Sequence, residues 1–146
     1  MSIPSRRACT EALKKLIEEE CGWPVDVGRA PTEQNSQQVE KPYVVILPQD
    51  RGVFSGPIFA NTTADAAFEY QIVSVGERYD QAELVADKVR QVLLEKDDTG
   101  AFTYQFTVPD LKVMDRTPGF DSPGKNLPQG TIFKVDDYFI IWITTS

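Results

Sequence analysis

The chain contains no histidine and only two cysteines among its 146 residues. Without histidine, the Ser-His and Cys-His catalytic pairs, the HExxH zinc helix and imidazole general acids or bases are all excluded. The cysteines do not have the Cys-x-x-Cys spacing of a structural zinc site. Neither a GxGxxG nor a GxxxxGK[ST] phosphate-binding loop is present. We therefore expect no cofactor, no bound metal and no enzymatic activity.

Long apolar runs are missing as well, since no run approaches the roughly 20 residues that a membrane span needs. The N-terminus carries Arg6 and Arg7 without the apolar segment of a secretory signal. We expect a protein that stays in the cytoplasm in which it is made, with no membrane partner. If one helix covers Cys9 and Cys21, about 18 Å separates them along its axis, too far for a disulfide. We expect free thiols, with Cys9 buried.

Basic residues are also scarce, with 15 Lys and Arg against 22 Asp and Glu and a formal net charge of −7. DNA-binding proteins use Lys and Arg to displace counterions from phosphates, so this balance argues against nucleic acid as the main partner. The acidity instead favours solubility or attraction to a positively charged protein surface. A chain of this length and composition is most simply one domain spanning residues 1–146.

The stretch from Phe68 to Leu94 predicts a strand that leads directly into an amphipathic helix. Apolar side chains alternate with polar ones until Gly76, which is typical of a half-buried strand. Asp80 is the predicted N-cap, with Glu83 three residues later in the capping-box position. The helix then places six residues on one apolar arc, namely Ala82, Val85, Ala86, Val89, Val92 and Leu93.

The remaining elements follow from the same periodicities. A helix is predicted over 4–20, ended by Gly22 and Pro24, and strands over 25–27, 43–47, 111–114 and 131–145, with 102–106 a strand or an extended segment. Within the last strand, Asp136-Asp137 is either a hairpin turn or a bulge. Long loops are predicted over 30–42, 49–65 and 115–130, and the second is either a projecting hairpin or a loop folded onto the core.

This order of elements predicts an α+β fold in which a single mixed or antiparallel β-sheet has two helices packed on one face, plus long projecting loops. The segment 138–143 is apolar on both faces, so it is central in the sheet or is covered by another subunit. Exposed apolar residues are the best candidates for a functional surface, because contiguous apolar surface marks protein interfaces. The candidate interface residues are Phe54, Ile58, Phe59, Leu84, Phe120 and Trp142. Alternatively, the long loops fold over the open face of the sheet.

Paired carboxylates are the one route to catalysis that the sequence offers. Asp97-Asp98 stands in a predicted turn beside Gly100, where Asp is favoured for turn chemistry alone. Asp136 and Asp137 are adjacent in a predicted strand and would point to opposite faces unless a turn redirects them. An acidic site at either pair is the weaker hypothesis.

The layout resembles that of the tail terminator (tail completion) proteins of long-tailed bacteriophages. The resemblance rests on the N-terminal helix with Ala12-Leu13 and Leu16-Ile17, the strand 43–47, the strand-turn-helix unit 68–94 and the closing apolar strand. It covers most of the chain as an order of elements and contains no diagnostic short motif. The lengths of the loops 49–65 and 115–130 depart from what the pattern requires.

The resemblance implies a structural virion protein with no catalytic residue. Members of that family form hexameric rings that cap the tail tube, stop its polymerisation and join it to the head connector. It therefore implies a homo-oligomer whose partners are the tail tube protein and the head-tail connector protein. It would be located at the head-proximal end of the virion tail, and in the host cytoplasm during assembly. The alternatives are another head-tail connector or neck protein, or a small soluble α+β binding module or enzyme with an acidic site.

Overall fold

A mixed sheet and two helices make up the described part of the chain, which in this computed structural model is residues 5–29, 42–49, 53–55, 65–109, 111–119 and 133–145. The elements in chain order are α1 (Arg6–Cys21), β1 (Val25–Val27), β2 (Tyr43–Pro48), β3 (Val53–Ser55), β4 (Asp65–Gly76), α2 (Tyr79–Leu94), β5 (Leu111–Pro118) and β6 (Phe133–Thr145). The predicted α+β class is confirmed.

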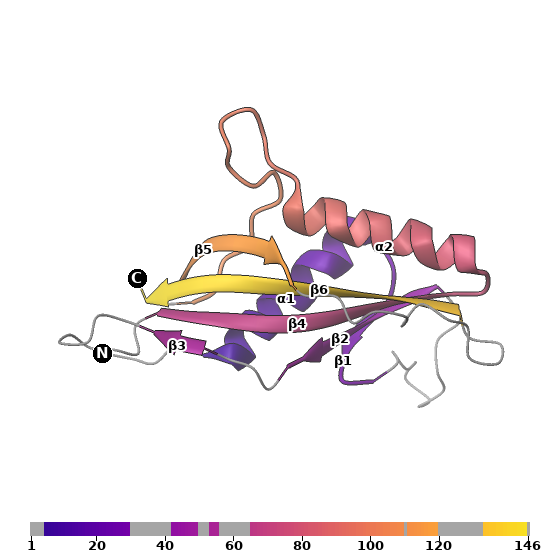
Figure 1. Cartoon of the computed structure of the whole chain (residues 1–146), viewed down its shortest axis with the longest axis horizontal. Coiled ribbons are helices and arrows are strands. Elements are labelled where there is room, and N and C mark those ends of the chain that lie inside the picture. The colour runs from indigo at the N-terminus through magenta and orange to yellow at the C-terminus, as the bar shows by residue number, and fades with distance from the viewer. Residues whose placement is uncertain are drawn as a thin grey trace.

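The sheet has the strand order β1-β2-β4-β6-β5, with β3 paired to β4 beyond the end of β2 (Figure 1). Only β1 and β2 are parallel, and every other pair is antiparallel. The two longest strands, β4 and β6, pair over twelve positions at the centre. The strand β6 is therefore central, which confirms one of the two explanations for its apolar character.

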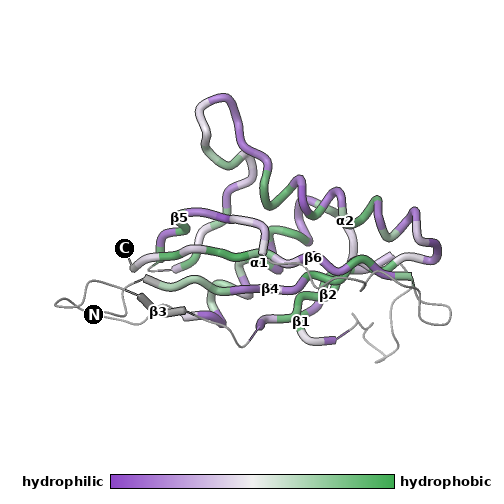
Figure 2. Tube along the Cα trace, in the orientation of Figure 1, coloured by the Kyte–Doolittle hydropathy of each residue, from purple (hydrophilic) through white to green (hydrophobic). Residues whose placement is uncertain are grey.

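Both helices contribute to a single core on one face of the sheet, here called the inner face. Alternate residues of β4 from Ala66 to Ile72 and of β6 from Phe139 to Ile143 join this core because the side chains of a strand alternate between faces. Figure 2 shows the apolar colour along the central strands and its alternation along α2. The fully buried members include Leu13, Ile17, Ile46, Phe68, Tyr70, Ile72, Val85, Val89, Leu93, Phe139, Ile141 and Ile143. All six residues of the predicted apolar arc of α2 are buried.

The helix starts differ from the predictions by a residue or two. Ser5 caps α1 with its side chain on the Ala8 amide, so this helix begins at Arg6. The N-cap of α2 is Arg78, without a side-chain cap, so the prediction of Asp80 as N-cap was wrong. The first turn of α2 lies directly against Gly76, where an added Cβ would stand 2.6 Å from the Ala82 amide nitrogen. This close packing makes the helix begin before Asp80.

The strand β6 is continuous through Asp136-Asp137, where a hairpin turn or a bulge was predicted, so both alternatives were wrong. Val73 and Ile72 of β4 pair with these two residues in unbroken register, which holds both in extended conformation. The irregularity lies in β5 instead, where the register shifts between Val113 and Asp115. One extra residue there, Met114, is typical of a β-bulge.

Two of the three predicted loops contain strand residues. The range 49–65 includes β3 and the first residue of β4, in hairpin-like antiparallel pairing. The range 115–130 was wrong at its start, because β5 continues to Pro118. A proline is tolerated there because the strand lies at the sheet edge, where one side of the ladder needs no donor. The rest of these loops, and residues 30–41 of the first, lie outside the described residues.

Candidate protein interface

The acidic pairs do not converge on a common site. Asp137 faces α2, where its Oδ2 lies 3.1 Å from Arg90 Nε, whereas Asp136 lies on the opposite face, 3.6 Å from Lys134 Nζ. Asp97 and the adjacent aspartate stand on an exposed turn. In the described ranges, no group of three His, Cys, Asp or Glu side chains is placed to hold a metal ion. The geometry therefore offers no converging carboxylates for general acid-base chemistry.

Among the six predicted interface residues, the structure describes the side chains of two, Leu84 and Trp142. Trp142 on β6 is 40% exposed and Leu84 on α2 is 62% exposed. Because α2 packs on the inner face while Trp142 points to the outer one, the two side chains lie on opposite sides of the sheet. Phe54 is described only as a backbone partner of Ala66 in β3. Ile58, Phe59 and Phe120 lie outside the described residues.

Trp142 is the exposed aromatic side chain of an area on the outer face of the sheet where apolar residues alternate with polar ones such as Glu69 and Asp115. Its register partners are Ala67 on β4 and Asp115 on β5, and its indole Nε1 donates to Thr117 Oγ1 at 3.1 Å. Two residues along β6 lies Ile140, which is half-buried. We call Ala67, Thr117, Tyr138, Ile140 and Trp142 the Trp142 surface. In the part of the chain that the structure describes, both helices pack on the other face, so neither covers this surface.

The outer face continues as a second apolar cluster toward the β2 side of the sheet. Tyr43, Val45, Val73 and Val75 are all buried there, with Leu47 packed against them. The central strands thus carry apolar residues on both faces, which is typical of sheets covered on both sides. An exposed tryptophan beside such a face is an unusual surface residue, because Trp is enriched at protein interfaces.

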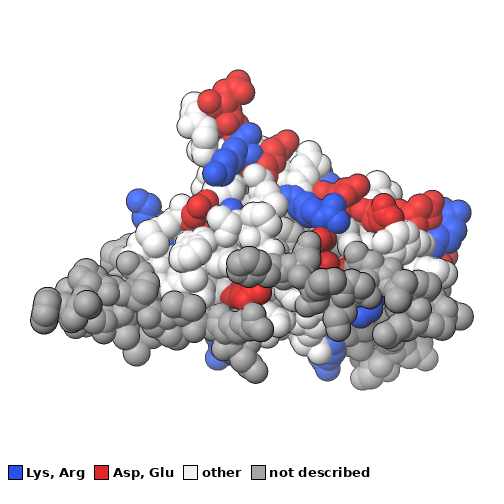
Figure 3. Space-filling model, viewed as in Figure 1, with Lys and Arg blue, Asp and Glu red and all other residues white. Residues whose placement is uncertain are grey.

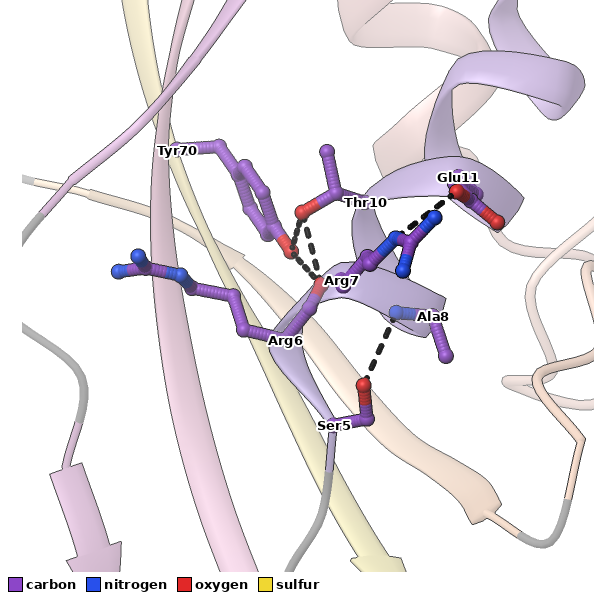
Figure 4. A network of polar contacts seen from close by, with 7 residues as sticks. All are labelled: Ser5, Arg6, Arg7, Ala8, Thr10, Glu11 and Tyr70. Carbon is purple, nitrogen blue, oxygen red and sulfur yellow. Dashed lines mark hydrogen bonds and ion pairs between the residues drawn. The ribbon is translucent and has the colours of Figure 1, made fainter.

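Sequence reasoning missed a groove beside the first half of α1. The groove has a volume of about 590 Å³ and is lined by Arg6, Arg7, Thr10, Glu11, Lys14, Asp26, Val27 and Pro48. Each of its three cations makes a contact within the described residues: one Arg6 guanidinium nitrogen donates to the Gln49 carbonyl, Arg7 pairs with Glu11 at 3.4 Å, and Lys14 pairs with Glu18 at 3.6 Å. Figure 4 shows the Arg6, Arg7 and Glu11 side chains on the first turns of α1. Two consecutive arginines at a helix start were the available signal.

A buried hydroxyl pair ties this end of α1 to the sheet (Figure 4). Thr10 Oγ1 lies 2.9 Å from Tyr70 Oη and also donates to the Arg6 carbonyl at 2.8 Å. The Tyr70 hydroxyl has a longer contact of 3.5 Å to the same carbonyl. Burial raises the pKa of Tyr70 far above its usual value, so this hydroxyl stays protonated. The hydrogen bonds of Thr10 and Tyr70 hold the first turns of α1, which form one wall of the groove, against β4.

The buried Arg116 fixes the segment that follows α2. Its guanidinium donates to the Leu93 carbonyl at 3.2 Å and to the Tyr104 carbonyl, and it lies over the rings of Phe102 and Phe106. A cation at the C-terminal end of a helix is favourable to the helix dipole. Burial lowers the pKa of Arg116 to about 10, well above neutrality, so the side chain remains charged. Its role is structural, and it anchors residues 102–106, which bend at Thr103 and Tyr104, against the end of α2.

On each of the two terminal strands of the sheet, β1 and β5, an aspartate occupies one edge amide. On β1, the Val27 amide donates to its neighbour Asp26 at 2.8 Å, and on β5 the Arg116 amide donates to Asp115 at 2.9 Å. These amides are thereby occupied by side chains, which is one way in which proteins block strand addition at an exposed edge. Faces and loops are accordingly better placed than edges to contact another chain.

The two cysteines are free thiols, as predicted. Burial raises the pKa of Cys9 and of Cys21 to about 11, so both thiols are protonated near neutral pH. Since the thiolate is the reactive species, neither is a candidate nucleophile in the folded protein.

Among the described residues, neither helix has the length and apolarity to cross a membrane. No protein-family model and no curated protein sequence matches the chain. Function must accordingly be argued from the surfaces described above.

Proposed function

We propose that the chain is a structural virion protein that resembles the tail terminators of long-tailed bacteriophages. Copies assemble into a hexameric ring that caps the tail tube, stops its polymerisation and joins it to the head connector. The observation that carries this proposal is the Trp142 surface, an area with a 40% exposed tryptophan on a sheet face that neither helix covers. Apolar surface of this kind marks protein contacts.

Two further features support an assembly role. The elements on which the resemblance rests occur in the expected order, from α1 through β2 and the β4-α2 unit to β6. The acidic pairs that favoured the enzyme hypothesis do not converge, because Asp136 and Asp137 lie on opposite faces of β6. We assign the Trp142 surface to contact with another protein of the tail assembly.

The proposal is tested by mixing the purified protein with polymerising tail tube protein and measuring tube lengths by negative-stain electron microscopy. We expect short tubes that end in a ring, and the Trp142→Glu variant should lose this capping with an unchanged far-UV circular dichroism spectrum. The control is Gln91→Glu, which places the same acid at an exposed position of α2 on the other side of the sheet and should keep capping. Tubes of unlimited length with the wild-type protein would overturn the proposal. A ring that binds only the connector would instead indicate a neighbouring neck protein.

A further inference from the structure

The charges of α1 run against the helix dipole at both ends. Helix N-termini favour acids and C-termini favour bases, by typically 0.3–1 kcal/mol for each charge. The first turn of α1 contains no acidic residue and begins with Arg6 and Arg7, and its last turn contains no basic residue and carries Glu18, Glu19 and Glu20. A local conflict of this kind, kept in an otherwise regular helix, points to a function for the charges.

The cations of the first turn line the 590 Å³ groove, which is of the size that binding sites usually have. The charged residues that line the groove are three bases, Arg6, Arg7 and Lys14, and two acids, Glu11 and Asp26, in a chain whose net charge is −7. Arg7 is highly accessible, with 89% of its side chain exposed and one surface ion pair. The groove is thus a local positive site that an acidic segment would fill.

An acidic segment that projects from the described part of the chain is the turn after α2, which contains Asp97 and Asp98. It stands out beyond the end of the helix in Figure 1, and acidic atoms cover its tip in Figure 3. Asp97 makes the turn rigid, because its Oδ1 accepts from the Thr99 amide at 2.8 Å, the Thr99 hydroxyl at 2.6 Å and the Ala101 amide at 3.2 Å. These bonds lower the pKa of Asp97. Asp98 is left exposed at the tip with its carboxylate free of this network.

The groove and the turn lie at opposite margins of the subunit, so they cannot meet within one chain. In Figure 1 the first turn of α1 is at the lower side of the sheet and the acidic turn is at the top. A contact between two different surfaces of identical copies is heterologous, and such contacts close into rings when the rotation permits. Edge-to-edge strand addition is disfavoured by Asp26 and Asp115, which occupy edge amides.

We propose that the groove lined by Arg6, Arg7 and Lys14 receives the acidic turn 97–101 of a second copy, and that this contact joins neighbouring subunits. The inference rests on the proposed ring and names the surfaces that close it. Because the turn is held by its own hydrogen bonds, docking it costs little ordering entropy. Carboxylates paired with arginine form charge-assisted hydrogen bonds, the stronger class of such bonds.

The test is a charge swap measured by light scattering over a concentration series. Arg7→Glu and Asp98→Lys each raise the concentration at which half of the chains are assembled by at least about tenfold, because like charges then face each other across the contact. The double variant Arg7→Glu/Asp98→Lys in one chain restores assembly close to wild type. These positions are chosen because the Arg6 guanidinium bonds the Gln49 carbonyl and Asp97 holds the turn.

Arg78→Glu is the matched control, since its side chain is 78% exposed and pairs only with Asp80, and it should leave assembly unchanged. Single reversals that leave assembly unchanged, or a double variant that stays as weak as the singles, would overturn the groove contact while leaving the ring in place. A wild-type chain that never assembles would overturn the ring and this contact together. Capping of tail tubes is scored separately, so a ring that closes through this contact but caps no tube refutes only the proposed function.

Discussion

The hydroxyl pair between α1 and β4 allows a sharp test of how the groove wall is held. Thr10→Val removes a hydroxyl that makes two short hydrogen bonds, at 2.9 Å to Tyr70 Oη and 2.8 Å to the Arg6 carbonyl. Tyr70→Phe removes the other partner and leaves Thr10 with its bond to that carbonyl. Both changes preserve shape closely, so the loss of hydrogen bonding dominates each of them.

The two variants should differ in magnitude because they leave different groups unpaired. After Tyr70→Phe, Thr10 stays bonded, so the cost is that of one buried hydrogen bond, about 1 kcal/mol. After Thr10→Val, the buried Tyr70 hydroxyl keeps only the 3.5 Å contact to Arg6 and its bond to the Cys9 thiol. Leaving a buried polar group poorly satisfied adds a desolvation penalty, so we expect about 2 kcal/mol for this variant.

Urea unfolding followed by circular dichroism measures both free energies, with the double variant completing a cycle. We expect unchanged m-values, Thr10→Val less stable than Tyr70→Phe, and a coupling free energy of about 1 kcal/mol between the two sites. A larger loss for Tyr70→Phe, or additive effects in the double variant, would refute the hydrogen-bond account of this wall.

The close packing around Gly76, Arg116 and the two cysteines is testable by unfolding and by thiol labelling. Gly76→Ala lowers the unfolding free energy by about 1–3 kcal/mol in urea titrations, because its Cβ has no room beside α2. Arg116→Met lowers it by about 3 kcal/mol in the same assay, because two buried carbonyls lose a charged donor; an unchanged midpoint would contradict either assignment. Cys9, which is fully buried, resists iodoacetamide at pH 8 until the chain unfolds, whereas the partly buried Cys21 reacts slowly because its pKa is raised to about 11; rapid labelling of Cys9 in the native protein would contradict its burial. Since the pKa of each thiol rises from 9.0 in the unfolded chain to about 11 in the fold, stability is unaffected below pH 9 and falls as pH rises toward 11.

The regular elements were predictable where a strong period met a clear boundary. The apolar arc of α2 and the alternation along β4 decide which side faces the core, and the helix-ending Gly22 has the left-handed φ of 79° that favours glycine. These are local signals, carried by side-chain spacing and backbone preference alone. They were sufficient for the fold class, whereas the central position of β6 was one of two alternatives that the sequence left open.

The errors came from tertiary contacts that no local pattern contains. Pairing with β4 over twelve positions overrides the turn preference of Asp136 and Asp137. The approach of α2 to Gly76 sets the helix start. Trp142 was predicted as an interface residue from its place on a doubly apolar strand, and the structure shows that its side chain is exposed. The α1 groove requires residues from three elements and was missed. The sequence does contain a signal for this groove, because α1 has basic residues in its first turn and acidic residues in its last, against the helix dipole.

The measurement that most directly tests the central claim is the mass of the purified protein by light scattering over a concentration series, with negative-stain images of the same samples. The proposed function predicts a closed ring of about six copies with a central hole, since heterologous contacts close into rings. A particle of one subunit at every concentration, including in the presence of tail tube protein, would contradict it.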